Sequence, residues 1–353
     1  MRFKALAVAG FAAASIVAAP AAADVTPISV GQGKAFKHKP SGIVVAPIIG
    51  GIARTGVAQY DDKQLDVIVD YRAPEDREVT TIFMFRNVTG GVPVWFDRIQ
   101  RTIETNKQLG TVSLAVPPAA FTPAGQPNAR GLRAAYSASG AGWMSSAAAI
   151  TATGQWYVAV RASSRSLPPD QLLARIDQAF AAIHWPKEKA SEPAATAITE
   201  CARPLPELAE AEPAPDDGAA LLLAAIGATL AQSKGTVRPT PAQWCRDPYR
   251  VANAGVYRPD GRVDQYLVAF QDAGRGIWVG PNSLGNLVAA ENGNAATYMI
   301  ELIDVDRNIG FGSYKTLPSV PQALWTIDHG RQTYATPTWG KDKSIQINAD
   351  AMK

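Results

Sequence analysis

The chain has 353 residues, of which 47% are hydrophobic and 18% are charged, and its formal net charge is +3. This apolar share is ample for burial, so the composition excludes wholesale disorder. Basic and acidic residues nearly balance, and no stripe of Lys and Arg follows any predicted element. The electrostatic pattern of a nucleic-acid-binding protein is therefore excluded as well.

The first 23 residues have the pattern of a secretory signal peptide. Arg2 and Lys4 give a positive start, residues 5–19 are apolar or small, and cleavage is predicted between Ala23 and Asp24. The apolar stretch is too short to span a bilayer, so we expect no transmembrane segment after signal removal. The remaining chain has 32 basic and 31 acidic residues, a net charge of +1. A periplasmic or secreted location is predicted.

Strand and helix patterns follow a loose N-terminal segment at residues 24–40. Residues 65–70 alternate apolar and polar side chains, which predicts a strand, and residues 80–86 predict its hairpin partner. Further predicted elements of the first half are a helix at 93–107, strands at 143–150 and 155–161, and a helix that Ser166 opens and Trp185 ends.

The helix predicted at 93–107 is amphipathic. It has Trp95 and Ile99 on its apolar face and Asp97 and Arg98 on the other face. We expect the apolar face to pack on the sheet.

The second half begins after a change of composition. Residues 187–217 are rich in Pro, Ala and Glu and read as a linker, and residues 218–232 predict a buried helix that is too short for a membrane span. Later predicted elements are strands at 266–270, 276–279, 297–303, 309–314 and 344–347, with a short helix at 319–328.

The expected fold class is α+β, with two domains that are each a mainly antiparallel sheet with helices packed on one face. The predicted division is a signal peptide at 1–23, a loose segment at 24–40, domain 1 at 41–186, a linker at 187–217 and domain 2 at 218–353. An internal echo suggests that domain 2 is a degenerate repeat of domain 1. Tyr71-Arg72-Ala73-Pro74 precedes one predicted strand and Tyr257-Arg258-Pro259-Asp260 another. The alternative is that hairpins of this kind are simply common.

The two cysteines are expected to form a disulfide. Cys201 and Cys245 lie in the exported part of the chain, and an even pair in an oxidising compartment usually becomes bridged. The closed loop would stabilise the fold by about 4 kcal/mol in the chain-entropy model. The alternative is two unrelated buried thiols.

One stretch of the first half resembles a known family. The sequence QWYVAVRASSRSLPPDQLLARIDQAFAAIHW is similar to the closing strand and final helix of PsbP-like α/β sandwiches, with a resemblance that spans about residues 40–186. It implies an antiparallel sheet covered by helices and a non-enzymatic role in assembly or interaction. No functional residue of the family maps onto this chain.

No motif for catalysis, a cofactor or a metal stands out. His38, His184 and His329 are not spaced as metal ligands, and no nucleophile elbow, Walker loop or dinucleotide fingerprint occurs. Asp304 and Asp306 resemble a calcium loop but lack its glycine and terminal glutamate, so a solvated turn is expected. We therefore predict no catalytic, cofactor-binding or metal-binding residue.

The leading hypothesis is an exported, non-catalytic accessory or binding module of the bacterial envelope, with an envelope protein or peptide as its partner. Some of the eight tryptophans would suit a peptide, glycan or protein surface. The alternative is a periplasmic hydrolase with a site assembled from distant residues. Its candidates are Ser163 or Ser164 near Arg161 and Arg165, or Asp328 with His329. A third hypothesis is an inhibitor or immunity-type protein with a large exposed apolar patch.

Overall fold

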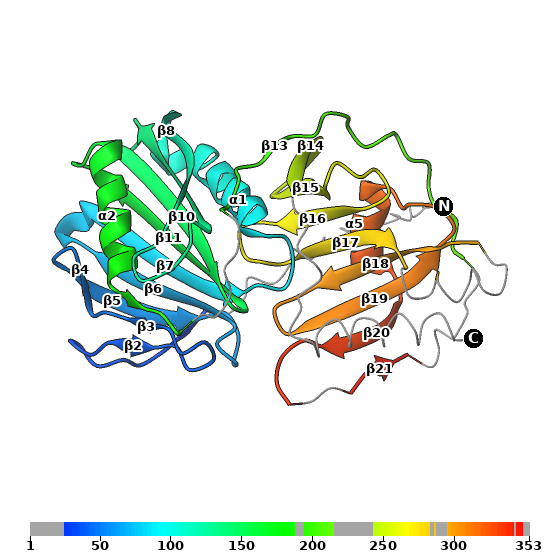
Figure 1. The fold of residues 1–353 in the computed structure, drawn as a ribbon, viewed down its shortest axis with the longest axis horizontal. Coiled ribbons are helices and arrows are strands. Elements are labelled where there is room, and N and C mark those ends of the chain that lie inside the picture. Colours follow the sequence, from blue (N-terminus) through cyan, green and yellow to red (C-terminus); the bar gives the residue numbers. More distant parts are fainter. Residues whose placement is uncertain are drawn as a thin grey trace, which may run out of the picture.

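Two large sheets stand side by side in this chain, with one helix between them (Figure 1). A computed structural model describes residues 25–187, 194–214, 243–282, 286, 295–341 and 344–348. Within these ranges there are three α-helices: α1 (Val92–Glu104), α2 (Pro169–Ala181) and α5 (Val320–His329). The predicted signal peptide, its cleavage site at Ala23 and Asp24, and the helix predicted at 218–232 lie outside the described residues.

The first sheet has nine antiparallel strands. They are β1 (Thr26–Pro27), β4 (Ile48–Ile49), β5 (Ile52–Gln59), β6 (Asp66–Arg72), β7 (Glu78–Arg86), β8 (Val112–Phe121), β9 (Gly131–Ala138), β10 (Ser145–Thr153) and β11 (Trp156–Ser164). The order is β1-β5-β6-β7-β11-β10-β9-β8, with β4 paired to β5. Strand β11 returns to pair with β7 over its whole length, from Trp156 opposite Arg86 to Ser164 opposite Glu78.

The two faces of the first sheet are both covered. Helix α2 covers one face, together with a small sheet of β2 (Phe36–Lys37), β3 (Val44–Val45) and β12 (Ile183–His184). Helix α1 covers the opposite face. Our expectation that the helices share one face was wrong. Strand β11 shows the reason, because Val158 and Val160 face α2 while Tyr157 and Ala159 face α1. Because every position of β11 from Trp156 to Val160 is apolar, both faces of the strand need cover.

The helix boundaries differ from the sequence prediction in small ways. Helix α2 begins after Pro168, which is its N-cap, and not at Ser166. The Oγ atom of Ser164 instead accepts hydrogen bonds from the backbone N–H groups of Ser166 and Leu167, at 3.2 and 3.0 Å. Helix α5 begins where expected, with the Ser319 side chain accepting from the Gln322 N–H.

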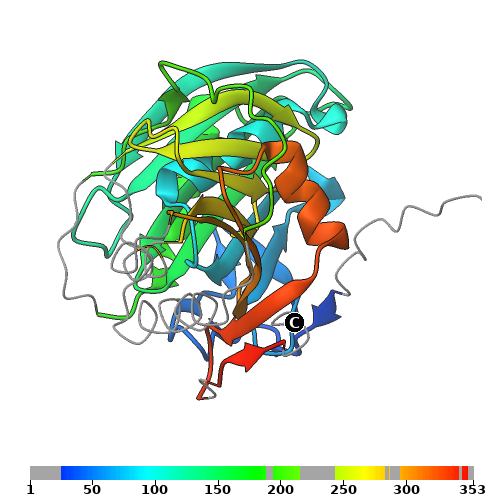
Figure 2. The same cartoon turned by 90° about the vertical axis from the view of Figure 1, so that its right-hand side faces the viewer.

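The second sheet is a meander of nine strands in chain order. They are β13 (Thr199–Glu200), β14 (Trp244–Val251), β15 (Ala254–Pro259), β16 (Tyr266–Phe270), β17 (Gly276–Pro281), β18 (Tyr298–Ile303), β19 (Arg307–Tyr314), β20 (Gln332–Pro337) and β21 (Gln346–Ile347). Only the β13–β14 pair is parallel among these described strands. Helix α5 packs on β17 and β18, and Figure 2 shows it at the outer surface of this half.

A strap, which we define as residues 195–214, runs from the first half along the second sheet. The Ala195 N–H donates to the Ala129 carbonyl, β13 pairs with β14, and Leu205 and Leu208 pack against the core under α5. The Ala214 N–H donates to the Ser313 carbonyl on β19. The segment does link the two sheets, but its described part is packed against them.

The internal echo falls on two hairpins, β6–β7 and β15–β16, and both of its tyrosines, Tyr71 and Tyr257, are fully buried. The surrounding connections differ. Before α2 the chain runs through β11, which pairs back with β7, whereas before α5 it runs through β19, which pairs with β18 and β20. Duplication stays a hypothesis.

Candidate functional site

The junction between the two sheets contains several buried charged residues, among them Asp66, Arg86, Asp97 and Arg98. Its apolar part is one continuous core, in which Trp95 and Ile99 of α1 join Trp244, Tyr257 and Leu267 of the second sheet. Helix α1 therefore has a sheet on each side. Sites in two-part proteins often form at such junctions, so we traced each charged group there.

Two charged residues of α1, Asp97 and Arg98, are buried in the junction. Asp97 is 5% exposed, and its two oxygens accept from Arg246 Nη1 at 2.5 Å and from the Tyr257 hydroxyl at 2.7 Å. Burial and the neighbouring carboxylate raise the pKa of Tyr257 well above its usual range. Arg98 Nε donates to the Gln271 carbonyl at 2.6 Å. Asp97 and Arg98, which the sequence placed opposite the apolar face of the helix, thus both contact the second half of the chain.

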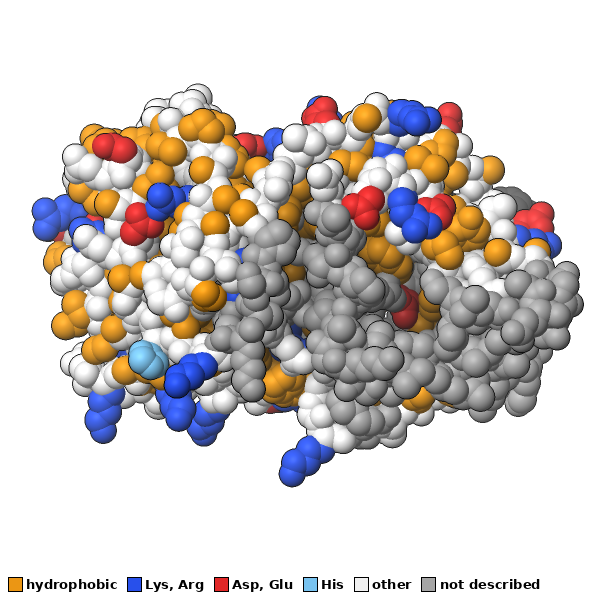
Figure 3. Space-filling view, viewed as in Figure 1, with side chains coloured by type: hydrophobic (Ala, Val, Ile, Leu, Met, Phe, Trp, Pro, Cys, Tyr) orange, Lys and Arg blue, Asp and Glu red, His pale blue; other side chains and the backbone are white. Residues whose placement is uncertain are grey.

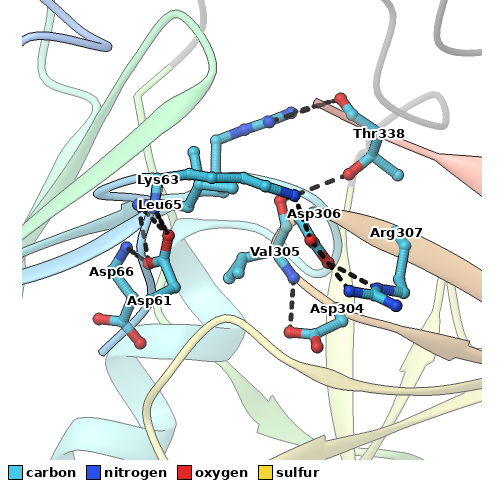
Figure 4. A network of polar contacts seen from close by, with 10 residues as sticks. Asp61, Lys63, Leu65, Asp66, Asp304, Val305, Asp306, Arg307 and Thr338 are labelled. Atoms are coloured by element: carbon cyan, nitrogen blue, oxygen red, sulfur yellow. Dashed lines mark hydrogen bonds and ion pairs between the residues drawn. The ribbon is translucent and has the colours of Figure 1, made fainter. Parts of the chain in front are cut away.

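A second group of charges joins the loop before β6 to the turn between β18 and β19 (Figure 4). The Asp61 carboxylate accepts from the backbone N–H groups of Lys63, Leu65 and Asp66, which orders the loop. Lys63 Nζ then reaches Asp306 Oδ2 at 2.7 Å. Asp306 also accepts from Arg307 at 2.9 Å. The 304–307 turn was expected to be solvated, but Asp306 is tied to the other sheet.

Arg275 bridges two carboxylates from different halves. It donates to Asp66 Oδ2 at 2.8 Å and to Asp304 Oδ1 at 2.7 Å. The Asp66 side chain is only 7% exposed. Burial raises the pKa of Asp66 to about 6, although the Arg275 charge and hydrogen bond act in the opposite direction. Perturbed carboxylates of this kind are common at functional sites and also in structural ion pairs.

An aromatic cluster closes the far end of the junction. Arg86 is 4% exposed and its guanidinium carbon lies 6.0 Å from the Trp156 ring centroid and 4.6 Å from that of Trp339. The two indole rings meet edge to face at 5.7 Å. Burial lowers the pKa of Arg86 to about 10, so this side chain stays charged at neutral pH. These contacts fix the end of β20 on the first sheet.

His38 lies beside this cluster and makes the nearest approach to a nucleophile–base pair. Its Nε2 lies 2.7 Å from the Gln64 carbonyl, which can only accept, so Nδ1 carries no proton and accepts from the Ser41 hydroxyl at 2.6 Å. Burial lowers the pKa of His38, against opposing effects of the Gln64 hydrogen bond and the Asp61 charge. A neutral imidazole bonded to a serine hydroxyl is the arrangement that nucleophilic catalysis uses.

The surroundings of this pair favour a structural role. The Ser41 Oγ also accepts from the Ile43 N–H at 3.1 Å, and backbone hydrogen bonds between His38 and Gly42 and between His38 and Ile43 complete the turn. The imidazole is fully buried and meets the Trp156 ring edge to face at 4.7 Å. The pair therefore clamps a tight turn onto the first sheet.

The structure does not bring the predicted hydrolase residues together with a base. Ser163 shares a hydrogen bond with Ser146 at 3.1 Å, and Ser164 caps the segment before α2. Arg161 pairs with Asp272 at 3.0 Å. The Arg165 guanidinium lies 4.3 Å from the centroid of the Trp143 ring.

The remaining candidates lie on α5. Both Asp328 and His329 are exposed there, and the His329 ring stacks on Trp325. His184, in β12, is exposed as well.

In the described part of the chain, no group of three or more His, Cys, Asp or Glu side chains is arranged to hold a metal ion. At the junction, Asp66, Asp97 and Asp306 each accept from an Arg, Tyr or Lys side chain of the other half, whereas Asp61 accepts from backbone N–H groups of its own loop. The first three carboxylates are therefore engaged in pairing across the junction.

The predicted disulfide is confirmed. Cys201 and Cys245 are bonded, with their Cα atoms 4.8 Å apart. The bond fastens the strap to β14 next to their short parallel pairing. The expected export to an oxidising compartment and the even number of cysteines were enough to predict this bond.

The junction itself was missed by sequence reasoning. Its pairs are far apart in the chain: Asp97 and Arg246 are separated by 149 positions, and Asp66 and Arg275 by 209. No local spacing encodes such contacts. The one available signal was the presence of charged residues in elements whose other positions are apolar.

Comparisons with known proteins add little. No protein-family model and no curated protein matches the chain. One solved structure, of a protein from Bacteroides thetaiotaomicron, aligns with 70% of this chain and 89% of its own at 13% identity, with a TM-score of 0.21, which carries no argument. The PsbP-like resemblance stays a hypothesis. Among the described residues, no helix is long and apolar enough to cross a membrane.

Proposed function

We propose that this chain is an exported, non-catalytic accessory or binding module of the bacterial envelope. The observation that carries the proposal is that the buried carboxylates at the junction are paired. The buried carboxylates Asp66 and Asp97 are both committed to side chains of the opposite sheet. Groups held in this way fix two sheets in one orientation, which suits a module that presents surfaces to a partner.

The disulfide supports the location. Bridged cysteines persist in oxidising compartments, and the Cys201–Cys245 bond joins two segments of the exported part of the chain. The N-terminal pattern of positive and apolar residues supplies the export signal. An envelope protein or peptide remains the proposed partner.

The surface of the chain agrees with a soluble module. On the coloured parts of the face drawn in Figure 3, charged and hydrophobic side chains are interspersed. Scattered apolar residues of this kind are normal on folded proteins.

A hydrolase is the second candidate function, because the Ser41 hydroxyl is bonded to a neutral imidazole at 2.6 Å. A fluorophosphonate probe, which reacts with activated serine hydroxyls, separates the two candidates. We expect the purified exported chain to remain unlabelled. Labelling that is lost in Ser41→Ala but kept in Ser163→Ala would replace the binding proposal with the enzyme.

A further inference from the structure

The first part of the described chain carries basic side chains without acidic ones. Residues 25–60 include Lys34, Lys37, Lys39 and Arg54 and contain no Asp or Glu. In the exported chain as a whole, basic and acidic residues nearly balance. The four positive charges are therefore a local excess and not one part of a generally basic surface.

The small sheet of β2, β3 and β12 has one buried row of side chains and one outer row. The register aligns three apolar side chains in the buried row: Phe36, Val45 and Ile183. The next row is Lys37, Val44 and His184, of which Lys37 and His184 are exposed. Successive side chains of a strand point to opposite faces, so this row faces away from the core. It includes a lysine and no carboxylate.

Two further lysines extend this basic surface. The alternation continues beyond β2, because His38 is buried and Lys39 is exposed. Lys34 is exposed in the turn before β2, and its carbonyl accepts from Arg54 Nη1 at 3.0 Å. Arg54 also donates to the Gly31 carbonyl at 3.1 Å, which brings a fourth positive charge to this turn. We call Lys34, Lys37, Lys39 and Arg54 the β2 basic face.

The lysines of the β2 basic face are not paired within the described chain. Lys34, Lys37 and Lys39 are all exposed, and none of their ammonium groups forms an ion pair with a described residue. Figure 3 shows Lys and Arg side chains gathered at the lower end of the first half, with no acidic side chain among them. Like charges on one surface repel each other, so the face favours a partner with negative charge.

The residue types of the face favour a lipid surface over a protein. Lysine is depleted at protein–protein interfaces, where aromatic side chains and arginine are enriched. A site for a single phosphate or carboxylate group is best built on the planar fork of arginine, but the Arg54 guanidinium is bonded to backbone carbonyls. Separate, exposed lysines suit a surface over which negative charge is spread. The headgroup layer of an anionic membrane is such a surface.

An exposed apolar side chain adjoins the β2 basic face. Ile48 of β4 is 55% exposed, whereas the next residue, Ile49, is buried in the core of the first sheet. Ile48 lies opposite Ala53 of β5, the residue before Arg54. Protein surfaces that lie on a membrane combine basic residues with apolar residues that enter the headgroup region. Ile48 supplies an apolar group of this kind.

We infer that the β2 basic face is a membrane-docking surface, which holds the exported chain against anionic lipid headgroups. The inference goes beyond the proposed function, because it assigns a lipid surface and does not depend on which protein or peptide the module binds. Each Lys or Arg close to an anionic membrane strengthens binding about fivefold, so three lysines together contribute about a hundredfold.

Sedimentation of the purified exported chain with lipid vesicles tests the inference. We expect the chain to bind vesicles of equal parts phosphatidylglycerol and phosphatidylcholine at about 0.05 M NaCl and to be released at about 0.5 M, because salt screens the charges. Vesicles of phosphatidylcholine alone should not bind it. Lys34→Gln, Lys37→Gln and Lys39→Gln together should weaken the binding about a hundredfold. Arginine at the same three positions keeps the charge and should preserve the binding.

A matched control removes the same amount of charge elsewhere. Lys107→Gln, Arg331→Gln and Lys341→Gln together replace three exposed basic residues outside the β2 basic face, and this variant should keep most of the binding. An equal loss in the two glutamine variants would show that only net charge matters and would overturn the docking surface.

The other outcomes separate the lipid surface from the proposed function. Absence of binding to the mixed vesicles, or equal binding to phosphatidylcholine alone, overturns the docking surface. Binding of a polyglutamate peptide through the three lysines, with the vesicles left unbound, also overturns it and makes an acidic protein the partner. None of these results touches the non-catalytic function, which fluorophosphonate labelling tests separately.

Discussion

The two faces of the second sheet are held by different chemistry. The inner face meets α1 and the first sheet through ion pairs and hydrogen bonds, such as Asp97 with Arg246 and Tyr257. The outer face is covered by α5 and by Leu205 and Leu208 of the strap, and the Cys201–Cys245 bond fixes the strap to β14. The contact at the inner face therefore depends on the protonation state of its paired side chains. The attachment of the strap depends on whether its cysteines are oxidised to a disulfide.

The largest effect is expected from the strap. Replacing both cysteines with serine should lower the free energy of unfolding by about 4 kcal/mol, because the loop between residues 44 positions apart gains entropy in the unfolded chain. Equilibrium denaturation with urea measures the loss. Limited proteolysis should then cut within the strap first. Equal resistance of the wild-type and double-serine proteins would show that the strap needs no covalent fastening.

A smaller effect is expected at Asp66, where acidification should raise the free energy of unfolding and not lower it. Its pKa is raised from 3.8 to about 6 in the folded protein, so the folded state binds this proton more tightly than the unfolded state does. The contribution to stability is complete below about pH 4 and is lost as the pH rises through 6. Acidification should therefore strengthen this part of the junction.

Asp66→Asn provides the test, because it keeps the shape and removes the titration. Relative to this variant, the wild-type free energy of unfolding should rise by about 1 kcal/mol between pH 8 and pH 5. Denaturation series at the two pH values measure the difference. A difference that falls on acidification would mean that the charged pair with Arg275 outweighs burial.

The smallest effect is expected at His38, where acidification should lower the free energy of unfolding. Burial lowers its pKa, so its contribution to stability is present above the unfolded value of 6.5 and is lost as the pH falls through the lowered value. His38→Gln should flatten this acid-side loss, and denaturation series at pH 7 and pH 5 measure the change. Parallel pH profiles for the wild-type and His38→Gln proteins would refute the buried neutral imidazole.

Much of each sheet could be predicted from the sequence, for reasons that specific strands illustrate. The hairpin partners β6 and β7 were found because their apolar spacing is local. Strand β14 was missed because it contains Pro248 and several charged residues, which suit an edge-like position and weaken the strand pattern. The location of α1 between two sheets could not be foreseen, since the partners of Asp97 lie on strands far along the chain.

The candidate site also has features that the sequence predicted and features that it did not. The disulfide followed from compartment and cysteine count, whereas the Arg275 bridge between Asp66 and Asp304 depends on how three distant turns meet. The exposed position of Trp325 could not be predicted either, because the sequence showed many tryptophans but not which one is exposed. Exposure is a property of the folded arrangement and has no local signature.

The central claim is that the buried polar groups of the junction serve to hold the two sheets together. Equilibrium unfolding of Asp97→Ala tests it most directly, with Glu104→Ala on the exposed side of the same helix as the control. We predict a loss of about 3 kcal/mol for Asp97→Ala, because Arg246 and Tyr257 lose a buried partner, and less than about 1 kcal/mol for the control. Equal small losses for the two variants would contradict the claim and leave the buried carboxylate free for another role.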